Sequence, residues 1–213
     1  MVELPDNSTE TLFSNSLPLT GEGVVIDIGA GDGLFVYQSA RRNPRKFYIG
    51  IDANPRPLAK ISEKIHRKPA KGGLANVLFL QAAVEELPEE LNETADEAHV
   101  HFPWGSLLRA VAIGDPSVLN NLRRICRPEA LLEVVIGVDP ERDRTELKRL
   151  GVPVISIEYI DSVLAGAYNK SGFEITERGI LLQSEWSCLE TSWARRLEGN
   201  VNRTVTFFIA RAI

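Results

Sequence analysis

The chain has 213 residues, of which 25% are charged and 44% hydrophobic, as is typical of one soluble globular domain rather than two. Its net charge of −5 argues against a protein that is basic all over and binds nucleic acid by bulk charge. No stretch approaches the roughly 18–20 apolar residues that cross a bilayer, and Cys126 and Cys188 form no disulfide or zinc pattern, so a cytoplasmic protein is expected.

Strands alternate with helices from residue 24 onward, which is typical of an α/β fold with a parallel sheet. Apolar and β-branched runs predict strands at 24–28, 47–51, 77–80, 98–102, 131–138, 173–182 and 204–210. Helical spacing and stop signals predict helices at 34–42, 55–67, 117–125 and 162–170. We therefore expect a mostly parallel seven-stranded sheet with helices on both faces, in which the last two strands form a hairpin and add an antiparallel edge strand.

Three stretches fit the alternation poorly, at about 103–115, 139–160 and 184–202. If the strands are assigned correctly, all three leave the sheet at one end, where open α/β sheets bind their ligands. We predict one domain over residues 24–213 with these inserted loops, preceded by an acidic arm over residues 1–23.

Charge is distributed unevenly along the chain. Residues 41–80 carry a net charge of +8, between blocks of −6 (residues 1–40) and −7 (residues 81–120). The densest basic run comprises Lys64, His66, Arg67, Lys68 and Lys71. Such a run is consistent with two alternatives, a solvated helix face or a patch that docks on phosphates.

A glycine-rich loop, DIGAGDG at residues 27–33, follows the first strand and opens the first helix. Asp52 ends the second strand, where a carboxylate can accept both ribose hydroxyls of a nucleoside. A dinucleotide fingerprint has the spacing G-x-G-x-x-G, whereas this loop has G-x-G-x-G and is flanked by Asp27 and Asp32. Carboxylates repel a pyrophosphate but suit the cationic amino-acid end of S-adenosylmethionine. The loop therefore favours an S-adenosylmethionine pocket over a plain strand–helix turn.

This set of motifs resembles the class I S-adenosylmethionine-dependent methyltransferases, which have a Rossmann-like fold. The resemblance implies that Asp27, Gly29 and Gly31 shape the methionine end of the cofactor site and that Asp52 holds the ribose. It also implies that the adenine of the cofactor is flanked by Ala83, Val84 and Glu85.

The fourth strand is followed by FPWGS at residues 102–106, which offers an indole and no acidic side chain. Superfamily members that methylate exocyclic amines usually have an Asn or Asp, two prolines and an aromatic residue there. Trp104 is consistent with two roles: packing in the core, or stacking on a base, which contributes roughly 1–3 kcal/mol per stacked base. Trp193, in the late inserted segment, can complete a sandwich around a base turned out of its helix.

Three segments narrow the resemblance: FPWGSLLR (102–109), KPAKGGL (68–74) and TSWARRL (191–197). They resemble the aminoglycoside-resistance 16S rRNA methyltransferases of the kanamycin–apramycin resistance family, over most of residues 24–210. The resemblance implies methylation of N1 of the decoding-site adenine in the assembled 30S subunit, with S-adenosylhomocysteine as product. Family members begin with a β-hairpin, whereas residues 1–20 show no clear strand alternation and no Lys or Arg.

The same resemblance implies roles for individual residues. Trp104 and Trp193 are the implied catalytic pair, which clamps the flipped adenine, and Ser106 and Thr191 line the pocket of cofactor and target. The implied rRNA-binding residues are Arg67, Lys68, Lys71, Arg196 and Arg203. Since N1 of adenine has an in-plane lone pair, we expect no general base, and catalysis rests on positioning.

Other interpretations stay open. His99 and His101 alternate along the fourth strand and share a face; without a neighbouring Cys or carboxylate a structural role is favoured, and no metal site is predicted. A methyltransferase of another RNA or a small molecule is the first alternative function, and a domain that binds S-adenosylmethionine or rRNA without turnover is the second. We expect a monomer that has no membrane partner.

Overall fold

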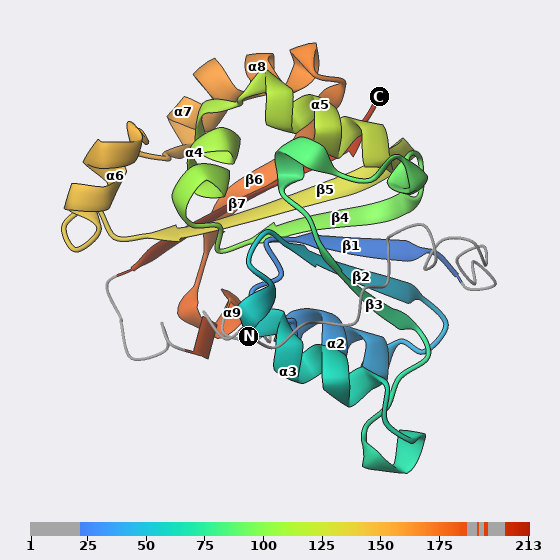
Figure 1. Cartoon of the computed structure of the whole chain (residues 1–213). Coiled ribbons are helices and arrows are strands. Elements are labelled where there is room, and N and C mark those ends of the chain that lie inside the picture. Colours follow the sequence, from blue (N-terminus) through green and yellow to red (C-terminus); the bar gives the residue numbers. More distant parts are fainter. Residues whose placement is uncertain (1–21, 187–190, 192–193, 196–202) are drawn as a thin grey trace.

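The computed structural model describes residues 22–186, 191, 194–195 and 203–213. Within these residues, seven strands form one sheet in the order β3-β2-β1-β4-β5-β7-β6 (Figure 1). The strands are β1 (Val24–Ile28), β2 (Phe47–Asp52), β3 (Val77–Gln81), β4 (Ala95–His101), β5 (Cys126–Val138), β6 (Phe173–Leu181) and β7 (Thr204–Ala212).

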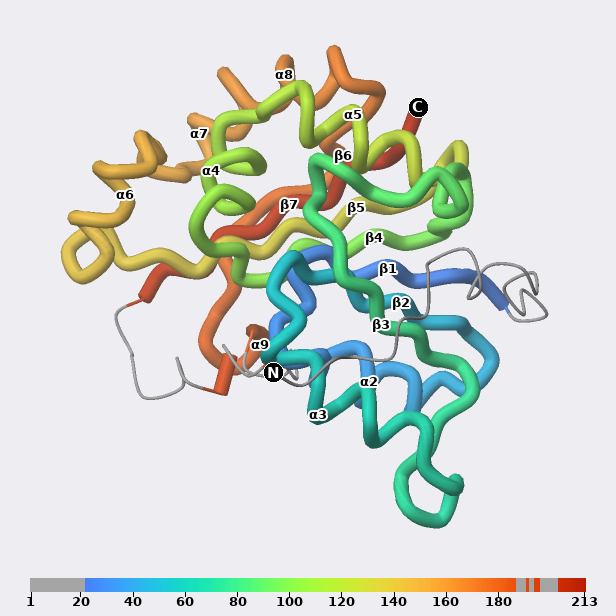
Figure 2. The backbone as a smooth tube through the Cα atoms, viewed as in Figure 1, coloured from blue at the N-terminus to red at the C-terminus, as the bar shows by residue number. Residues whose placement is uncertain are grey.

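The sheet is mostly parallel, as the sequence predicts. β1 pairs in parallel with β2 and β4, and parallel pairing continues to β3 on one side and β5 on the other. β7 runs antiparallel to both β5 and β6, which confirms the late hairpin. This antiparallel strand lies one position in from the edge, because β6 forms the outer strand. After β3 at one edge, the chain crosses back over the sheet and enters β4, which lies beside β1 (Figure 2).

Helices lie on both faces of the sheet (Figure 1). One face is covered by α2 (Leu34–Arg42), α3 (Pro55–Ile65) and α9 (Gln183–Trp186). The helices on the other side are α4 (Gly105–Ile113), α5 (Pro116–Ile125), α6 (Arg144–Leu150), α7 (Ile157–Tyr159) and α8 (Ala165–Lys170). Because both faces of β1 are covered, all five of its residues, VVIDI, are buried.

Two of the inserted stretches contain helices that periodicity did not predict. α4 occupies most of residues 103–115, and its interior is almost wholly apolar, with Leu108 and Val111 fully buried. A helix packed on several sides lacks the polar stripe that marks an amphipathic helix. The stretch 139–160 contains α6 and α7, and α7 continues through a π-helical turn, Ile160–Leu164, into α8. The predicted 162–170 helix is therefore the second half of a longer helical segment.

The core lies mainly between the sheet and the α4–α5–α8 side, with a smaller cluster between α2 and the first three strands. A third cluster joins Phe102, Trp186 and Ala194 to β5 and β7. Cys126 belongs to the main core, where burial raises the pKa of its thiol to about 12 and leaves it unreactive. None of the helices in the described ranges has the length and apolar character needed to cross a lipid bilayer.

Candidate functional site

A cavity of about 300 Å³ opens at the carboxyl ends of β1, β2, β3 and β4. Its walls come from the glycine loop, the end of β2, the turn after β3 and the segment after β4. The lining residues are Ile28, Gly29, Gly31, Ile51, Asp52, Ala53, Ala82, Ala83, Val84, Glu85, Phe102, Pro103, Trp104, Ser106 and Leu107. The cavity therefore brings together four segments that are far apart in the sequence.

The glycine loop forms the floor of this cavity, and its glycines are needed for two different reasons. Gly29 and Gly31 have φ angles of +77° and +58°, a region that side chains with a Cβ rarely adopt. A Cβ on Gly29 would also lie 2.7 Å from Leu107 Cδ2, so the loop and α4 approach closely only because this side chain is absent. The loop thus exposes its backbone to whatever occupies the cavity.

Asp52 links β2 to the glycine loop. The Gly31 amide donates to Asp52 Oδ2 at 2.8 Å, and the Asn54 amide donates to Asp52 Oδ1 at 2.8 Å. Each carboxylate oxygen has a second lone pair, so Asp52 can hold the loop and still accept hydroxyl donors. A polar acceptor beside apolar walls from Ile28 and Ile51 suits a nucleoside such as that of S-adenosylmethionine.

The segment after β4 turns sharply at Phe102, whose φ of +48° is unusual for a residue with a side chain. The Phe102 amide donates to the Val135 carbonyl at 2.8 Å, which fixes the turn to β5. Trp104 follows at the start of α4, and it is 40% exposed while lining the cavity. The alternative that Trp104 is a core residue is therefore wrong, and Ser106 lies beside it on the cavity wall.

Asp27 is placed differently from the other predicted cofactor residues. It is only 4% exposed and is absent from the described cavity lining. On β1 it pairs with His99 of β4 in the register of the sheet. Burial raises the pKa of its carboxyl, an effect that the nearby imidazole of His101 opposes.

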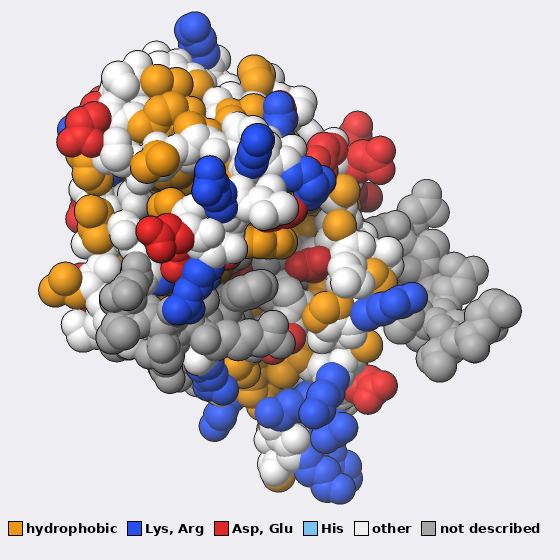
Figure 3. All heavy atoms as spheres, turned by 90° about the vertical axis from the view of Figure 1, so that its left-hand side faces the viewer, with side chains coloured by type: hydrophobic (Ala, Val, Ile, Leu, Met, Phe, Trp, Pro, Cys, Tyr) orange, Lys and Arg blue, Asp and Glu red, His pale blue; other side chains and the backbone are white. Residues whose placement is uncertain are grey.

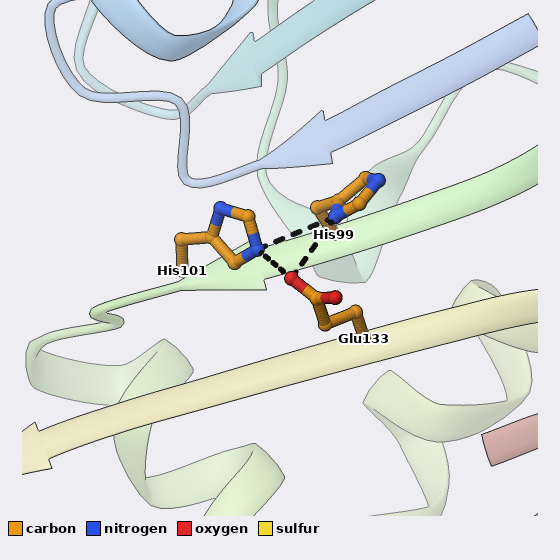
Figure 4. A group of neighbouring side chains, drawn as sticks. All are labelled: His99, His101 and Glu133. Carbon is orange, nitrogen blue, oxygen red and sulfur yellow. Dashed lines mark hydrogen bonds and ion pairs between the residues drawn. The ribbon is translucent and has the colours of Figure 1, made fainter. Parts of the chain in front are cut away.

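His99 and His101 on β4 contact the carboxylate of Glu133, which is distant in sequence and lies on the neighbouring strand β5. His101 Nε2 lies 2.5 Å from Glu133 Oε1, and His99 Nδ1 lies 3.5 Å from the same oxygen (Figure 4). Burial disfavours the imidazolium of His99, but its contacts with Glu133 and Glu97 outweigh burial and raise its pKa to about 9. The premise that these histidines have no neighbouring carboxylate is therefore wrong.

The late segment is described at Thr191, Ala194 and Arg195, while Trp193 and Arg196 lie outside the described residues. Thr191 Oγ1 accepts the Ala194 amide at 2.9 Å, and Thr191 is absent from the cavity lining among the described residues. Ala194 is fully buried in the cluster that contains Phe102. The described part of this segment therefore packs against the turn that leads to Trp104.

The predicted basic docking residues lie on a turn at the far end of α3. Arg67, Lys68 and Lys71 are exposed, and the turn is held by the Tyr37 hydroxyl, which donates to the Gly72 carbonyl at 3.0 Å. Figure 3 shows Lys and Arg side chains gathered at the lower part of the molecule, where α2 and α3 lie in Figure 1. Since α3 starts just after Asp52 and rises 1.5 Å per residue, the turn lies roughly 16 Å from the cavity.

Arg203 is not presented to solvent. Its side chain is 8% exposed, and its guanidinium donates to Asp143 Oδ2 and to the Gly137 carbonyl, both at 2.8 Å. The geometry favours an internal role for Arg203, joining the start of β7 to the segment before α6, over the rRNA contact implied by the resemblance.

Sequence reasoning missed several lining residues, among them Ala53, Ala82, Phe102, Pro103 and Leu107. Each of these residues lies next to or within a sequence motif assigned to the site, so its position beside the motif is the signal that could have identified it. A second hollow of about 410 Å³ lies beside α6, lined mainly by aliphatic side chains such as Leu147, Val154 and Ile180. Since its described lining has neither a carboxylate nor a glycine loop, it does not compete as a cofactor site.

Comparisons with known proteins agree with this geometry. The family model NpmA, described as 16S rRNA (adenine(1408)-N(1))-methyltransferase, matches residues 9–212. A protein of that name from Streptoalloteichus hindustanus is 38% identical over 181 residues, which cover 84% of this chain and 82% of the relative.

Two solved structures are also similar over most of the chain. The aminoglycoside resistance methyltransferase NpmB1 has a TM-score of 0.81 at 45% identity, covering 91% of this chain and 89% of the other. A tryptophan-to-alanine variant of the adenine-1408 enzyme from Catenulisporales acidiphilia, crystallised with its cosubstrate S-adenosylmethionine, has a TM-score of 0.84 at 31% identity. The superposition covers 91% of this chain and 87% of the variant's chain.

Proposed function

The chain belongs to the 16S rRNA (adenine(1408)-N(1))-methyltransferase family, and from this premise we propose how its residues divide the work of cofactor, target and ribosome binding. The protein transfers a methyl group from S-adenosylmethionine to N1 of adenine 1408 in 16S rRNA, within the 30S subunit, and so confers aminoglycoside resistance. The observation that carries the assignment of residues is the single cavity that joins Asp52 and the glycine loop to Trp104.

We assign the cofactor to the part of the cavity formed by β1, β2 and β3. Gly29 and Gly31 supply close backbone contact for the methionine end, and Asp52 accepts the ribose hydroxyls. Ala83, Val84 and Glu85 form the adenine wall, and Ser106 closes the side toward the target. We assign Asp27 to support of the glycine loop through its buried position on β1. Thr191 is proposed to approach the pocket from the late segment, because its hydroxyl holds Ala194, which packs in the cluster of Phe102.

The bound cofactor supplies an electrophilic methyl group on a sulfonium. The protein then has to orient the target base, because N1 of adenine attacks with a lone pair and needs no deprotonation. In the described lining the carboxylates are Asp52 and Glu85, which come from β2 and from the turn after β3, whereas Trp104 follows β4. This separation supports catalysis by positioning rather than by a general base.

Trp104 is the proposed stacking surface for the target adenine. Its indole is the large apolar side chain that remains substantially exposed on the cavity wall, at 40%. We propose Trp193 as the second face of the clamp, since its neighbour Ala194 packs in the cluster of Phe102, two residues before Trp104. The methylated adenine is cationic, and indole faces attract that charge.

Docking on rRNA is assigned to Arg67, Lys68 and Lys71, which are exposed on a turn whose backbone is fixed. Arg196 is assigned to the rRNA backbone near the target from its place in the late segment. We further propose that the protein acts as a cytoplasmic monomer without a membrane partner, as one domain over residues 24–213 with an N-terminal arm over 1–23. An assembled ribosomal subunit is reached in the cytoplasm, which supports this location.

The test is methylation of purified 30S subunits with isotopically labelled S-adenosylmethionine, followed by primer extension across the decoding region. We expect one strong stop at adenine 1408 and label incorporation near one methyl per subunit. Matched reactions use subunits with guanine at that position, which should stay at background, and the Trp104→Ala enzyme, which should be slowed about 100-fold. A stop at another base, or methylation of a small molecule in the absence of ribosomes, would contradict the assignment.

A further inference from the structure

Three side chains on two neighbouring strands converge beneath α2, outside the cavity lining. His99 and His101 alternate on β4 and therefore point to one face, and Glu133 lies opposite His99 in the register of β5. His99 Nδ1, His101 Nε2 and a Glu133 carboxylate oxygen lie within 4.8 Å of one another, and Figure 4 shows the three groups pointing toward a common centre. Two imidazoles and a carboxylate form a donor set that divalent zinc, cobalt and nickel prefer.

We propose that His99, His101 and Glu133 form a binding site for one divalent transition-metal ion, for which Zn²⁺ is the reference ligand. Tetrahedral zinc with bonds of about 2.0–2.1 Å separates its ligand atoms by about 3.3 Å. His99 Nδ1 lies 3.3 Å from His101 Nε2 and 3.5 Å from Glu133 Oε1, close to that spacing. The remaining pair, His101 and Glu133, lies at 2.5 Å and has to widen by about 1 Å, through rotation of Glu133.

The burial of the three side chains fits a site that is fixed on one side and open on the other. His101 is 3% exposed and His99 14%, and the ring of Phe35 packs on both imidazoles with centroids 4.7 and 5.4 Å away. Glu133 is 30% exposed, so of the three groups its carboxylate is the one that solvent reaches most readily.

An outer layer of partners is also present. The second nitrogen of His99, Nε2, lies 3.7 Å from Glu97 Oε2, and Lys46 Nζ holds the other oxygen of Glu97 at 2.5 Å. Metal-binding histidines commonly direct their second nitrogen at a carboxylate, which fixes the ring and strengthens the ligand. Asp27, opposite His99 on β1, interacts electrostatically with both histidines, while burial raises the pKa of its carboxyl.

The position of the site suggests what an ion would do there. His101 is the last residue of β4, and the next residue is Phe102, whose φ of +48° begins the turn to Trp104. An ion bound to His101 and Glu133 would hold the end of β4 against β5 and so stabilise the turn that carries the proposed stacking surface. The site is structural in this assignment and takes no part in methyl transfer.

The test measures metal binding by the whole, chelator-treated protein. Co²⁺ titration should give visible absorption typical of a low-coordinate imidazole–carboxylate site, with one equivalent bound, and Zn²⁺ should displace it and raise the Tm. Glu133→Gln preserves side-chain shape and should weaken Zn²⁺ binding by more than tenfold; Glu97→Gln, a change in the outer layer, should weaken it by roughly 10- to 100-fold.

His66→Asn is the matched control, since it removes an exposed histidine at the end of α3. It should bind Zn²⁺ as the unaltered protein does. Circular dichroism and S-adenosylmethionine affinity verify that each variant is folded. Glu133→Gln is preferred to a substitution of the buried His101, because it changes a partly exposed side chain. The proposal is overturned if the unaltered protein shows neither Co²⁺ absorption nor a Zn²⁺-dependent Tm, or if Glu133→Gln binds Zn²⁺ as tightly as the unaltered chain.

Discussion

The cavity and the basic turn at residues 66–72 are both assigned to RNA methylation, yet their side chains are held in different ways. In the cavity, Asp52 is fixed by two backbone amides, and the path to Trp104 is fixed by the hydrogen bond from Phe102 to β5. On the basic turn the backbone is fixed by Tyr37, but Lys68 and Lys71 extend into solvent. Changes in the first region should therefore alter chemistry or folding, and changes in the second should alter docking alone.

Arg203 provides the sharpest test of this distinction, because the resemblance groups it with Lys68 while the structure buries it. Arg203→Ala removes the cationic partner of the largely buried Asp143 carboxylate, which keeps only the Asp139 amide, so the free energy of unfolding should fall by about 3 kcal/mol. Denaturant unfolding measures the change. Arg178→Ala, which removes an exposed ion pair with Asp161, should cost less than about 1 kcal/mol. An equal loss of unfolding free energy in the two variants would mean that Arg203 contributes no more to stability than an exposed arginine does.

Trp104→Ala tests the target side of the cavity. Loss of the stacking surface should lower the rate of 30S methylation by about 100-fold, since the base is no longer positioned for attack. The affinity for S-adenosylmethionine, measured by calorimetry, should change by less than about threefold, because the cofactor contacts are proposed to come from loop backbone atoms and Asp52. Trp104→Phe retains an aromatic face and should keep most of the activity. Full activity of the alanine variant would exclude a stacking role.

Asp52→Ala tests the cofactor side. The variant removes the acceptor for the ribose and for the Gly31 and Asn54 amides, so S-adenosylmethionine should bind roughly 10- to 30-fold more weakly. Asp32→Ala is the matched control, because Asp32 belongs to the same loop but is outside the described cavity lining. Its cofactor affinity should stay within about twofold of the unaltered value, and a similar loss in both variants would mean that general loop charge, rather than Asp52, holds the cofactor.

Lys68→Glu should have the smallest effect of the set, confined to docking. We expect 30S affinity to fall roughly five- to tenfold at low salt, with the salt dependence of binding reduced by about one unit, as for one lost phosphate contact. Lys71→Glu should behave alike, whereas Lys170→Glu, exposed at the end of α8, should not change binding. Filter binding across a salt series measures the slope. Unchanged affinity in both turn variants would make the basic run a solvated surface.

Local signals were enough to predict a large part of the fold. β1 and α2 have the predicted bounds, since a β-branched run ended by glycines and a helix stopped before Pro44 depend on adjacent residues. A large part of the cavity lining followed from the same kind of signal, because Asp52 and the glycine loop end consecutive parallel strands. The α4 helix was missed because its apolar sequence has no polar face to reveal a period.

The sequence by itself determined the seven strands in chain order, the helices α2, α3, α5 and α8, the glycine loop, Asp52 and the basic run, each of which depends on neighbours along the chain. Only the tertiary structure decided that Glu133 faces His99 and His101, that Arg203 is buried on Asp143, and that Asp27 is buried and absent from the described cavity lining. These pairs are set by sheet register and by packing between distant segments. No local period encodes which strand will lie beside which, so their chemistry appears only when β4, β5 and β7 are brought together.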